Sequence, residues 1–250
     1  MSLGFKQLRF GEGFQRTDLV TVSAGDIHVY GISLDIAGAE MSRASRILSD
    51  EERARADCLV SESHRHQFIV AHAGLRLILS RYCGEPSHGL AIQKSVQGKP
   101  FVPDYPLVRF NLTHAHGRAI IAVANDREIG VDLEKIRPEV DVIALAKRFL
   151  SDRDVTFIKS SGPGQHHQRF LQAWVAREAV FKATGTGMTF PFHGAHFELA
   201  SRGAEGRLIL GDGKTEGAIR FVQFLPLDLG WVGAVAADGR DWSIVLCNTT

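Results

Sequence analysis

Two carboxylates spaced two residues apart are the first candidates for chemistry in this sequence. Asp132 and Glu134 stand in the run Gly130-Val131-Asp132-Leu133-Glu134. Strand side chains alternate between two faces, so a strand here places both carboxylates on one face and turns Val131 and Leu133 toward the core. Two like charges side by side repel each other, and a hard cation such as Mg²⁺ would convert that repulsion into a binding site. A solvated strand edge is the alternative, unless a third carboxylate converges on the pair.

Glu178 is the candidate for that third carboxylate. It lies in a predicted helix over residues 173–184, beside the stripe that faces the core. The residues of this stripe are Phe170, Trp174, Arg177 and Phe181. Lys182 follows Glu178 at i+4, where the two could form no more than a stabilising pair on the helix surface. The functional alternative is that Glu178 completes an acidic triad around a metal ion while Lys182 meets an anionic oxygen of a substrate.

A strand that ends in polar groups is the third candidate. His114 ends the run Phe110-Asn111-Leu112-Thr113-His114 and precedes Asp132 by 18 residues, about one strand–turn–strand unit. His114 could therefore lie beside the carboxylates. It could instead bind a metal together with His116, since alternate strand residues share a face, although zinc is disfavoured without a further ligand. The histidines at positions 166, 167, 193 and 196 have no such context, and we expect them at the surface.

Basic residues that could bind phosphate gather in the first half of the chain. They are Arg53 and Arg55 in one predicted helix, Arg65 and Arg76 in the next, and Lys99 in Gly98-Lys99-Pro100. Arginines on amphipathic helices usually face solvent, which is the alternative for each of them. The sequence has no glycine-rich phosphate loop and no dinucleotide-binding fingerprint, which excludes the usual nucleotide-binding folds.

An internal repeat organises the elements that carry these residues. Leu48-Ser49-Asp50 recurs as Leu150-Ser151-Asp152, an offset of 102 residues. The same offset pairs His64 with His166, Phe68 with Phe170, and Ala71 with Ala173. Each copy begins with a Ser-Asp pair suited to a helix N-cap and ends at a glycine, Gly84 or Gly185, so each predicts two helices. Gly162-Pro163-Gly164 separates the helices of the second pair.

Strands are predicted around these helical pairs. Their expected ranges are residues 27–36, 107–112, 119–124, 128–133, 195–199, 218–224 and 231–236. We therefore expect an α+β fold of two similar halves, residues 1–125 and 126–250, each with a helical pair on a small sheet. The changeover falls at Asn125-Asp126, a turn signal that would also suit an ordinary hairpin. A ligand would lie in the cleft between the halves.

Composition narrows the class of protein further. The chain has 250 residues, 29 basic against 28 acidic side chains and a formal charge of +1, which excludes a strongly basic nucleic-acid-coating protein. Its three cysteines are odd in number and far apart, so we expect neither a disulfide framework nor a structural zinc site. No apolar run approaches the roughly 18 residues of a membrane helix. We expect a soluble, cytoplasmic protein that binds neither nucleic acid nor membrane.

Four motifs in order resemble those of the 4′-phosphopantetheinyl transferases of the Sfp type. They are Gly98-Lys99-Pro100, Asn111-Leu112-Thr113-His114, Gly130-Val131-Asp132-Leu133-Glu134 and Trp174-Val175-Ala176-Arg177-Glu178-Ala179-Val180-Phe181-Lys182. The resemblance spans positions 28 to 200, and the last two motifs with their spacing are its specific part. A chain with two halves resembles the monomeric Sfp type rather than the short, trimeric type, so the resemblance implies a monomer.

This resemblance implies a Mg²⁺-dependent transfer of phosphopantetheine from coenzyme A to a serine hydroxyl of an apo carrier protein, with release of adenosine 3′,5′-bisphosphate. By similarity, Asp132, Glu134 and Glu178 would hold the metal. Glu178 would also be the base for the serine proton, and Lys182 would steady the charge on the phosphates. The residues that would bind coenzyme A are Arg53, Arg55, Arg65, Lys99, Thr113, His114 and Lys182, with His114 and Arg65 at the 3′-phosphate.

Two positions depart from the family pattern. The family commonly has lysine just before the helix glutamate, where this chain has Arg177, and Glu52 occupies a position that is often basic. Two other functions would use the same residues differently. A Mg²⁺-dependent phosphohydrolase would act on a nucleotide or phosphoester without a carrier protein, and a non-catalytic binding module would keep the carboxylates as a solvated face.

Overall fold

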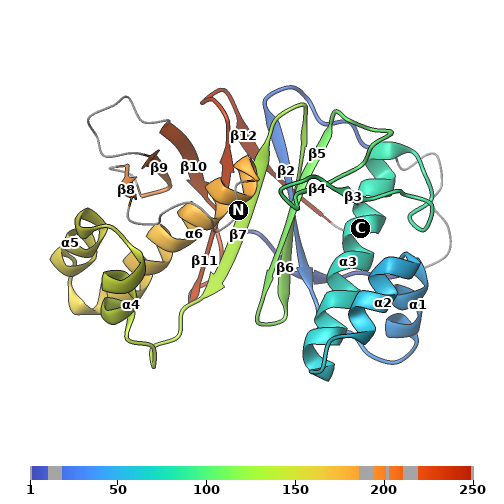
Figure 1. Cartoon of the computed structure of the whole chain (residues 1–250), viewed down its shortest axis with the longest axis horizontal. Helices are drawn as coiled ribbons and strands as arrows, with labels where there is room; N and C mark the ends of the chain where they lie inside the picture. Colours follow the sequence, from blue (N-terminus) through green and yellow to red (C-terminus); the bar gives the residue numbers. More distant parts are fainter. Residues whose placement is uncertain (1, 11–18, 186–193, 201–202, 211–218, 249–250) are drawn as a thin grey trace.

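Two β-sheets that pack face to face form the centre of the molecule, and helices cover the outer side of each (Figure 1). The computed structural model describes residues 2–10, 19–185, 194–200, 203–210 and 219–248. Helices and strands are mixed along this part of the chain, which confirms the predicted α+β class. Among the described helices, none combines the length and the apolar composition needed to cross a lipid bilayer. All three cysteines are free thiols.

The first sheet is built by the N-terminal part of the chain and one late strand. Its strand order is β1-β2-β6-β5, with β12 also paired to β2. The strands are β1 (Lys6–Gln7), β2 (Asp26–Ser33), β5 (Val108–Ala115), β6 (Arg118–Asn125) and β12 (Ser243–Cys247). The helices on this side are α1 (Ala39–Ile47), α2 (Asp50–Asp57) and α3 (Glu62–Cys83). A separate hairpin pairs β3 (Gln93–Lys94) with β4 (Pro100–Phe101).

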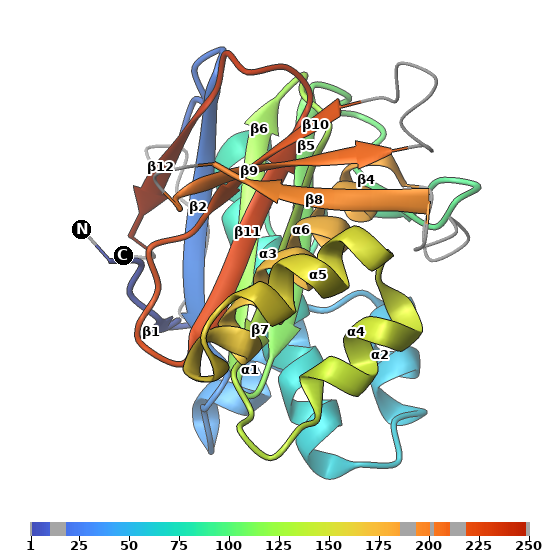
Figure 2. The ribbon, with the colours of Figure 1, turned by 90° about the vertical axis from the view of Figure 1, so that its left-hand side faces the viewer.

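The second sheet has the strand order β7-β11-β10-β9-β8, and all its described pairs are antiparallel. The strands are β7 (Ile129–Lys135), β8 (Ala195–Leu199), β9 (Glu205–Leu210), β10 (Ile219–Phe224) and β11 (Trp231–Ala237). The helices on this side are α4 (Val142–Phe149), α5 (Asp152–Ser160) and α6 (His166–Thr184), with the short 3₁₀ helix η2 (Pro163–Gln165) before α6. Figure 2 shows β8 to β11 in front of the first sheet, with α4 and α5 below them.

Three apolar clusters hold the layers together. One lies between α3 and the first sheet, and a second lies between α6 and the second sheet. The third fills the space between the sheets, where Ile27 and Val29 of β2 meet Val131 and Leu133 of β7. The layer order is therefore helix, sheet, sheet, helix, and each sheet is buried on both faces over much of its area.

The predicted elements agree with the structure where the pattern was strong. The two helical pairs correspond to α2 with α3 and α5 with α6, and the seven predicted strands correspond to β2, β5, β6, β7, β8, β10 and β11. Helices α1 and α4 and strands β1, β3, β4, β9 and β12 were not predicted. The turn at Asp126 has a positive φ of 47°. It leads from β6 in one sheet to β7 in the other, so it is not a hairpin.

The division of the chain at residues 125 and 126 stays a prediction, as does the duplication of the halves. The early strands lie in the first sheet and β7 to β11 lie in the second. The chain then returns, because β12 pairs in parallel with β2. Each helical pair nevertheless begins and ends as the sequence indicates. Ser49 and Ser151 form capping boxes with Glu52 and Asp154 at the starts of α2 and α5.

Glu52 has a second role that its place in the capping box does not reveal. Its carboxylate accepts hydrogen bonds from Arg76 Nε at 2.5 Å and from His72 Nδ1 at 3.2 Å, both on α3. The Arg76 guanidinium is 2% exposed and also donates to the carbonyls of Ser87 and Leu90. Burial opposes ionisation of Glu52, but the bonds from His72, the Ser49 amide and Arg76 prevail and lower its pKa to about 2. Glu52 therefore ties α2 to α3.

This arrangement predicts an acid-dependent loss of stability that Glu52→Gln removes. The folded-state pKa of Glu52 is depressed, so its contribution is present above the unfolded-state pKa and disappears as pH falls toward the folded value. The difference in unfolding free energy between wild type and Glu52→Gln should shrink by about 2 kcal/mol between pH 7 and pH 3. Urea titrations at several pH values measure it. A difference that does not change with pH would contradict the prediction.

Candidate active site

Strand β7 turns its two carboxylates toward α6, as the alternation pattern predicts. Val131 and Leu133 are buried between the sheets. The other face carries Asp132, whose carboxylate meets Lys182 of α6. Gly130 lies on the same face, because a Cβ atom built there would come within 2.0 Å of the Ala179 carbonyl oxygen. This contact between backbones brings the carboxylate face of β7 directly against the helix that carries Glu178.

Asp132 is the centre of the polar contacts. Its side chain is 7% exposed, and its Oδ1 atom accepts hydrogen bonds from Lys182 Nζ at 2.7 Å and from Thr113 Oγ1 at 3.2 Å. Lys182 also donates to Thr113 Oγ1 at 3.1 Å. The three residues come from β7, α6 and β5, so the site lies where the edges of both sheets meet the long helix of the second.

Two carboxylate oxygens of this site are buried without a hydrogen-bond partner among the described residues. They are Asp132 Oδ2 and Glu178 Oε1. Burial and the nearby Asp132 charge raise the pKa of Glu178, while Lys182 opposes the rise. Burial and Asp132 also raise the pKa of Glu134, with Glu178 adding to the effect and Arg137 and Lys182 opposing it. Unpartnered buried acceptors are costly, so the carboxylates are incomplete without a further positive group.

A divalent cation with oxygen ligands fits this set. In the described part of the chain, no three His, Cys, Asp or Glu side chains are already gathered as a metal site. The chemistry of the donors is nevertheless suited to Mg²⁺, which binds through one or two carboxylates and keeps other positions for water and phosphate oxygens. The orphaned oxygens of Asp132 and Glu178 are the atoms that such an ion would satisfy.

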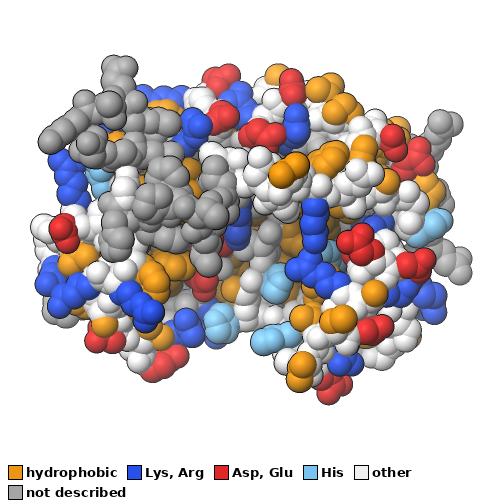
Figure 3. All heavy atoms as spheres, in the orientation of Figure 1, with side chains coloured by type: hydrophobic (Ala, Val, Ile, Leu, Met, Phe, Trp, Pro, Cys, Tyr) orange, Lys and Arg blue, Asp and Glu red, His pale blue; other side chains and the backbone are white. Residues whose placement is uncertain are grey.

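Strand β5 supplies the opposite wall of the site. Asn111 Oδ1 accepts the backbone N–H of Val131 at 2.9 Å, which joins β5 to β7 across the two sheets. His114 follows at the end of the same strand and is exposed. Desolvation by the surrounding protein atoms nevertheless lowers the pKa of its ring, and the nearby His72, Lys182 and His64 lower it further. In Figure 3, histidine side chains gather around the hollow at the centre of this face of the molecule.

Arg55 and Arg65 lie on the helices α2 and α3, which pack beside the first sheet. The Arg55 guanidinium lies 5.6 Å from the centre of the Phe68 ring, and that ring stacks on His72 at 4.0 Å. The Arg65 guanidinium donates to the Leu59 carbonyl at 3.0 Å, and its Nε atom is buried without a hydrogen-bond partner in the described part of the chain. His72 was not among the predicted site residues. It lies seven positions after Arg65, two turns along the same helix face, and that spacing was the available signal.

Arg53 and Lys99 are engaged elsewhere. Arg53 bonds the Leu48 carbonyl and pairs with Asp50, which ties it to the start of its own helix. Lys99 Nζ pairs with Glu128 and donates to the carbonyls of Ile129 at 3.1 Å and Ala183 at 2.6 Å. Lys99 therefore connects the loop between β3 and β4 to the start of β7 and the end of α6.

Lys99→Met should lower the unfolding free energy by about 2 kcal/mol, because it leaves two carbonyls and one carboxylate without their shared donor. Lys94→Met is the matched control, since Lys94 lies in the same hairpin and is exposed. Urea denaturation of both variants measures the difference. Equal stabilities would show that the Lys99 contacts with β7 and α6 do not stabilise the fold.

The expectation that the histidines at positions 166, 167, 193 and 196 lie at the surface is wrong for one of them. His196 is 7% exposed, and its Nε2 atom lies 2.9 Å from Arg153 Nη1, so it is buried in strand β8 and not at the surface. His166 and His167 are half-buried and donate to the carbonyls of Ser161 and Val140. His193 lies outside the described residues. His116 sits in the turn after β5 with a φ of 44° and lies edge-on to Trp231.

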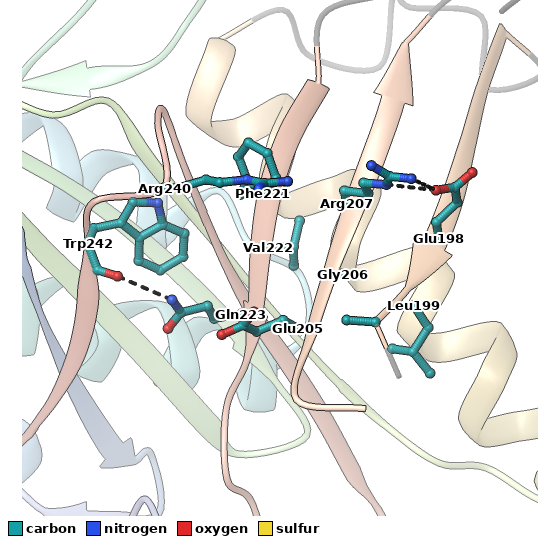
Figure 4. Close-up of a pocket in the computed structure, with 11 residues that line it drawn as sticks. Glu198, Leu199, Glu205, Gly206, Arg207, Phe221, Val222, Gln223, Arg240 and Trp242 are labelled. Atoms are coloured by element: carbon teal, nitrogen blue, oxygen red, sulfur yellow. Dashed lines mark hydrogen bonds and ion pairs between the residues drawn. The ribbon is translucent and has the colours of Figure 1, made fainter. Parts of the chain in front are cut away.

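Two cavities lie near the second sheet, on opposite faces of it. The first is an apolar cavity of about 250 Å³ between α4 and α6. Glu134 lines it, together with Phe149, Phe170 and Trp174. The second, of about 470 Å³, lies over β8, β9 and β10 (Figure 4). Its Arg240 guanidinium stacks on Phe221 at 4.0 Å. Glu134 lines the first cavity, whereas none of the three carboxylates lines the second.

Comparisons with known proteins point to one family. The model of the 4′-phosphopantetheinyl transferase superfamily matches residues 128–236, which include β7 and all of α6. The 4′-phosphopantetheinyl transferase HetI of Nostoc sp. strain PCC 7120 is 33% identical over 172 residues, covering 68% of this chain and 73% of the relative. The 4′-phosphopantetheinyl transferase Sfp of Bacillus subtilis strain 168 is 26% identical over 165 residues, covering 65% and 72%.

A more distant relative is the human L-aminoadipate-semialdehyde dehydrogenase-phosphopantetheinyl transferase. It is 22% identical over 173 residues, which cover 65% of this chain and 56% of the relative. All of these proteins are named as phosphopantetheinyl transferases, so the comparisons give no support to the phosphohydrolase alternative.

Proposed function

This chain belongs to the 4′-phosphopantetheinyl transferases of the Sfp type, and from that premise we propose how its own residues move a phosphopantetheine group from coenzyme A to a carrier protein. The acceptor is a serine hydroxyl of an apo acyl, peptidyl or aryl carrier, and the second product is adenosine 3′,5′-bisphosphate. Fatty-acid, polyketide and nonribosomal peptide synthesis are the processes that use such carriers.

One observation carries the assignment of the reacting centre. Among the residues that the structure describes, Asp132 and Glu178 each have a buried oxygen without a hydrogen-bond partner. They lie on facing elements, and the Lys182 ammonium is 2.7 Å from Asp132 Oδ1. Incomplete carboxylates beside a lysine suit a substrate that brings both a cation and anionic oxygens. The diphosphate of coenzyme A with its Mg²⁺ is such a substrate. We propose Asp132, Glu134 and Glu178 as the metal-binding residues, and the ion would neutralise charge on the diphosphate.

Glu178 is also the proposed general base. In the reaction, the serine oxygen forms a bond to the β-phosphorus of the diphosphate while the bond from that phosphorus to the bridging oxygen breaks. The serine proton passes to Glu178, and the bridging oxygen leaves with the adenosine bisphosphate. Burial and Asp132 raise the pKa of Glu178, which makes it a stronger base than an exposed glutamate. Lys182 is placed to meet the growing negative charge on the phosphates.

The nucleotide end of coenzyme A is proposed to bind along α3 and β5. His114 lies near Lys182 and His72, and Arg55 contacts the Phe68 ring that stacks on His72. The 3′-phosphate is proposed to meet His114 and Arg65. Thr113 already bridges Lys182 and Asp132 and would hold Lys182 in place. Arg53 and Lys99 remain proposed contacts, although each would have to exchange a carbonyl or carboxylate partner for a phosphate oxygen.

The apolar cavity beside Glu134 suits the remaining part of the substrate. Its wall of Phe149, Phe170 and Trp174 borders one of the proposed metal-binding residues. The pantetheine arm has no charge and could extend along this wall once the diphosphate is held.

All proposed site residues lie in a single chain, so a monomer would be active. The free thiols fit a reducing compartment, and we propose the cytoplasm.

The test is a transfer assay on the whole chain. The protein is incubated with coenzyme A, Mg²⁺ and a panel of unrelated apo carriers, and each carrier is weighed by mass spectrometry. We expect a phosphopantetheine mass on at least one carrier and none when Mg²⁺ is removed by chelation. No mass shift on any carrier, together with phosphate release from coenzyme A alone, would overturn the assignment and indicate a hydrolase.

A further inference from the structure

Arg177 is fully buried beside the proposed base, yet it points away from the reacting centre. It precedes Glu178 on α6, and neighbouring helix residues lie about 100° apart around the axis. Glu178 therefore faces β7 while the Arg177 guanidinium reaches toward α5 and β8. Both Arg177 and Asp154 are 0% exposed and form an ion pair. A charge in this position needs a reason beyond the packing of the helix.

The Arg177 guanidinium bonds to three secondary-structure elements, α6, α5 and β8. Its Nη1 atom donates to the Ala173 carbonyl at 3.0 Å, one turn earlier on α6. Its Nη2 atom donates to Asp154 of α5 and to the Ala195 carbonyl of β8 at 2.8 Å. Only a planar group with several fixed donors can make this set of bonds, so the guanidinium fixes an orientation as well as a distance.

Both oxygens of the Asp154 carboxylate are also engaged in hydrogen bonds. Its Oδ2 atom accepts the Ser151 amide at 3.2 Å within the capping box of α5, and its Oδ1 atom accepts the Phe197 amide of β8 at 2.8 Å. Strand β8 is the last strand of its sheet. The pair therefore satisfies two backbone groups, the Ala195 carbonyl and the Phe197 N–H, on the edge of β8 that pairs with no described strand.

A buried ion pair is a poor way to gain stability. Desolvation of two charges offsets most of their attraction, and apolar replacements are often as stable. In some proteins a buried charged pair instead selects one geometry, because removing either partner leaves an uncompensated charge. The same device recurs in the first half, where Glu52 of a capping box pairs with the buried Arg76 of the long helix.

We propose that Arg177, held by Asp154 and β8, is a positioning residue that fixes the rotation of α6 and thereby aims Glu178 and Lys182 at Asp132. The inference rests on the proposed function for its catalytic consequence. Its anchoring part stands on its own, because α6 should loosen when the pair is broken whether or not the chain transfers phosphopantetheine. The effect should fall mainly on kcat, because the nucleotide end of coenzyme A, proposed to lie along α3 and β5, does not depend on the rotation of α6.

Four variants test the proposal. Asp154→Asn keeps the shape and removes the charge, Arg177→Met removes the guanidinium, and Arg177→Lys keeps a charge that can meet Asp154. Ile158→Val is the matched control, because Ile158 is a buried neighbour on α5 whose shortened side chain weakens the core without touching the pair.

Hydrogen exchange and kinetics are then measured at a temperature where every variant is folded. Amides of residues 173–183 should exchange at least tenfold faster in Asp154→Asn and Arg177→Met than in Ile158→Val. The kcat should fall at least tenfold in the same two variants, with the KM for coenzyme A within threefold of wild type. Arg177→Lys should recover part of the lost kcat, because it keeps a charge that can meet Asp154 but not the whole set of bonds.

The possible outcomes separate the anchoring of α6 from the positioning of Glu178 and from the proposed function. If Arg177→Met does not fold, Asp154→Asn and Arg177→Lys carry the test alone. Unchanged exchange in Asp154→Asn would overturn the anchoring. Faster exchange with kcat equal to that of Ile158→Val would overturn the positioning role. An inactive wild type would overturn the proposed function, and the exchange measurement would still decide whether the pair anchors α6.

Discussion

Glu178→Gln will lower kcat for transfer to an apo carrier on the order of a thousandfold while leaving the protein folded. The substitution keeps the size and shape of the side chain but removes both the proposed base and one carboxylate of the proposed metal site. Burial and the Asp132 charge disfavour the ionised form of Glu178, since they raise its pKa. Removing that charge relieves repulsion, so the melting temperature should stay unchanged or rise slightly.

The control is Glu205→Gln, because Glu205 is exposed on the opposite face of the second sheet. It should retain wild-type kcat. Transfer is followed by the mass of the carrier at saturating coenzyme A and Mg²⁺, and folding by thermal denaturation. A Glu178→Gln enzyme that keeps more than one-tenth of the wild-type kcat would remove Glu178 from the role of base.

Local patterns in the sequence predict the carboxylate face of the site well. The period of two in β7 separates Val131 and Leu133, which are buried between the sheets, from Asp132, which meets Lys182. The helical period likewise places Arg177 within the buried stripe of α6. Capping boxes at Ser49 and Ser151 follow from neighbouring residues alone. In each case the physics acts within one element, so the signal lies within a few positions of sequence.

Contacts between distant segments could not be predicted in this way. Lys99 carries a motif that suggests phosphate binding, yet its ammonium is bonded to Ile129 and Ala183, which lie 30 and 84 positions away. Strand β12 returns to pair with β2 across the whole chain, and its short exposed pattern gives no hint of that partner. These features depend on which surfaces meet after the elements form, and residue type does not encode that.

The Asp154 carboxylate, which supports α6 from the side away from the site, also has partners that the sequence does not reveal. Its capping role is visible from Ser151 three positions earlier, but its bonds to Arg177 and to the Phe197 amide join residues 23 and 43 positions away. A helical wheel marks Arg177 as buried and leaves open what neutralises it. The answer requires the packing of α5 and β8 on α6.

Gly130 has the largest expected effect on stability, and its importance lies in what a side chain would meet. A Cβ atom at this position would lie 2.0 Å from the Ala179 carbonyl oxygen and 2.4 Å from the Ala183 amide nitrogen. Both are backbone atoms of α6, so neither can move aside without the whole helix. Gly130→Ala should therefore lower the unfolding free energy by at least about 3 kcal/mol, at the upper end of the cost of overpacking.

The same displacement should reach the chemistry. Moving α6 away from β7 lengthens the contact of 2.7 Å between Lys182 Nζ and Asp132 Oδ1 and withdraws Glu178 from the same face. Gly164→Ala is the matched control, since a Cβ there meets no heavy atom within 4 Å. Urea denaturation should separate the two variants clearly, and the Gly130 variant that remains folded should transfer phosphopantetheine more slowly. If Gly130→Ala were as stable and as active as Gly164→Ala, the close approach of β7 and α6 could not be what sets the geometry of the site.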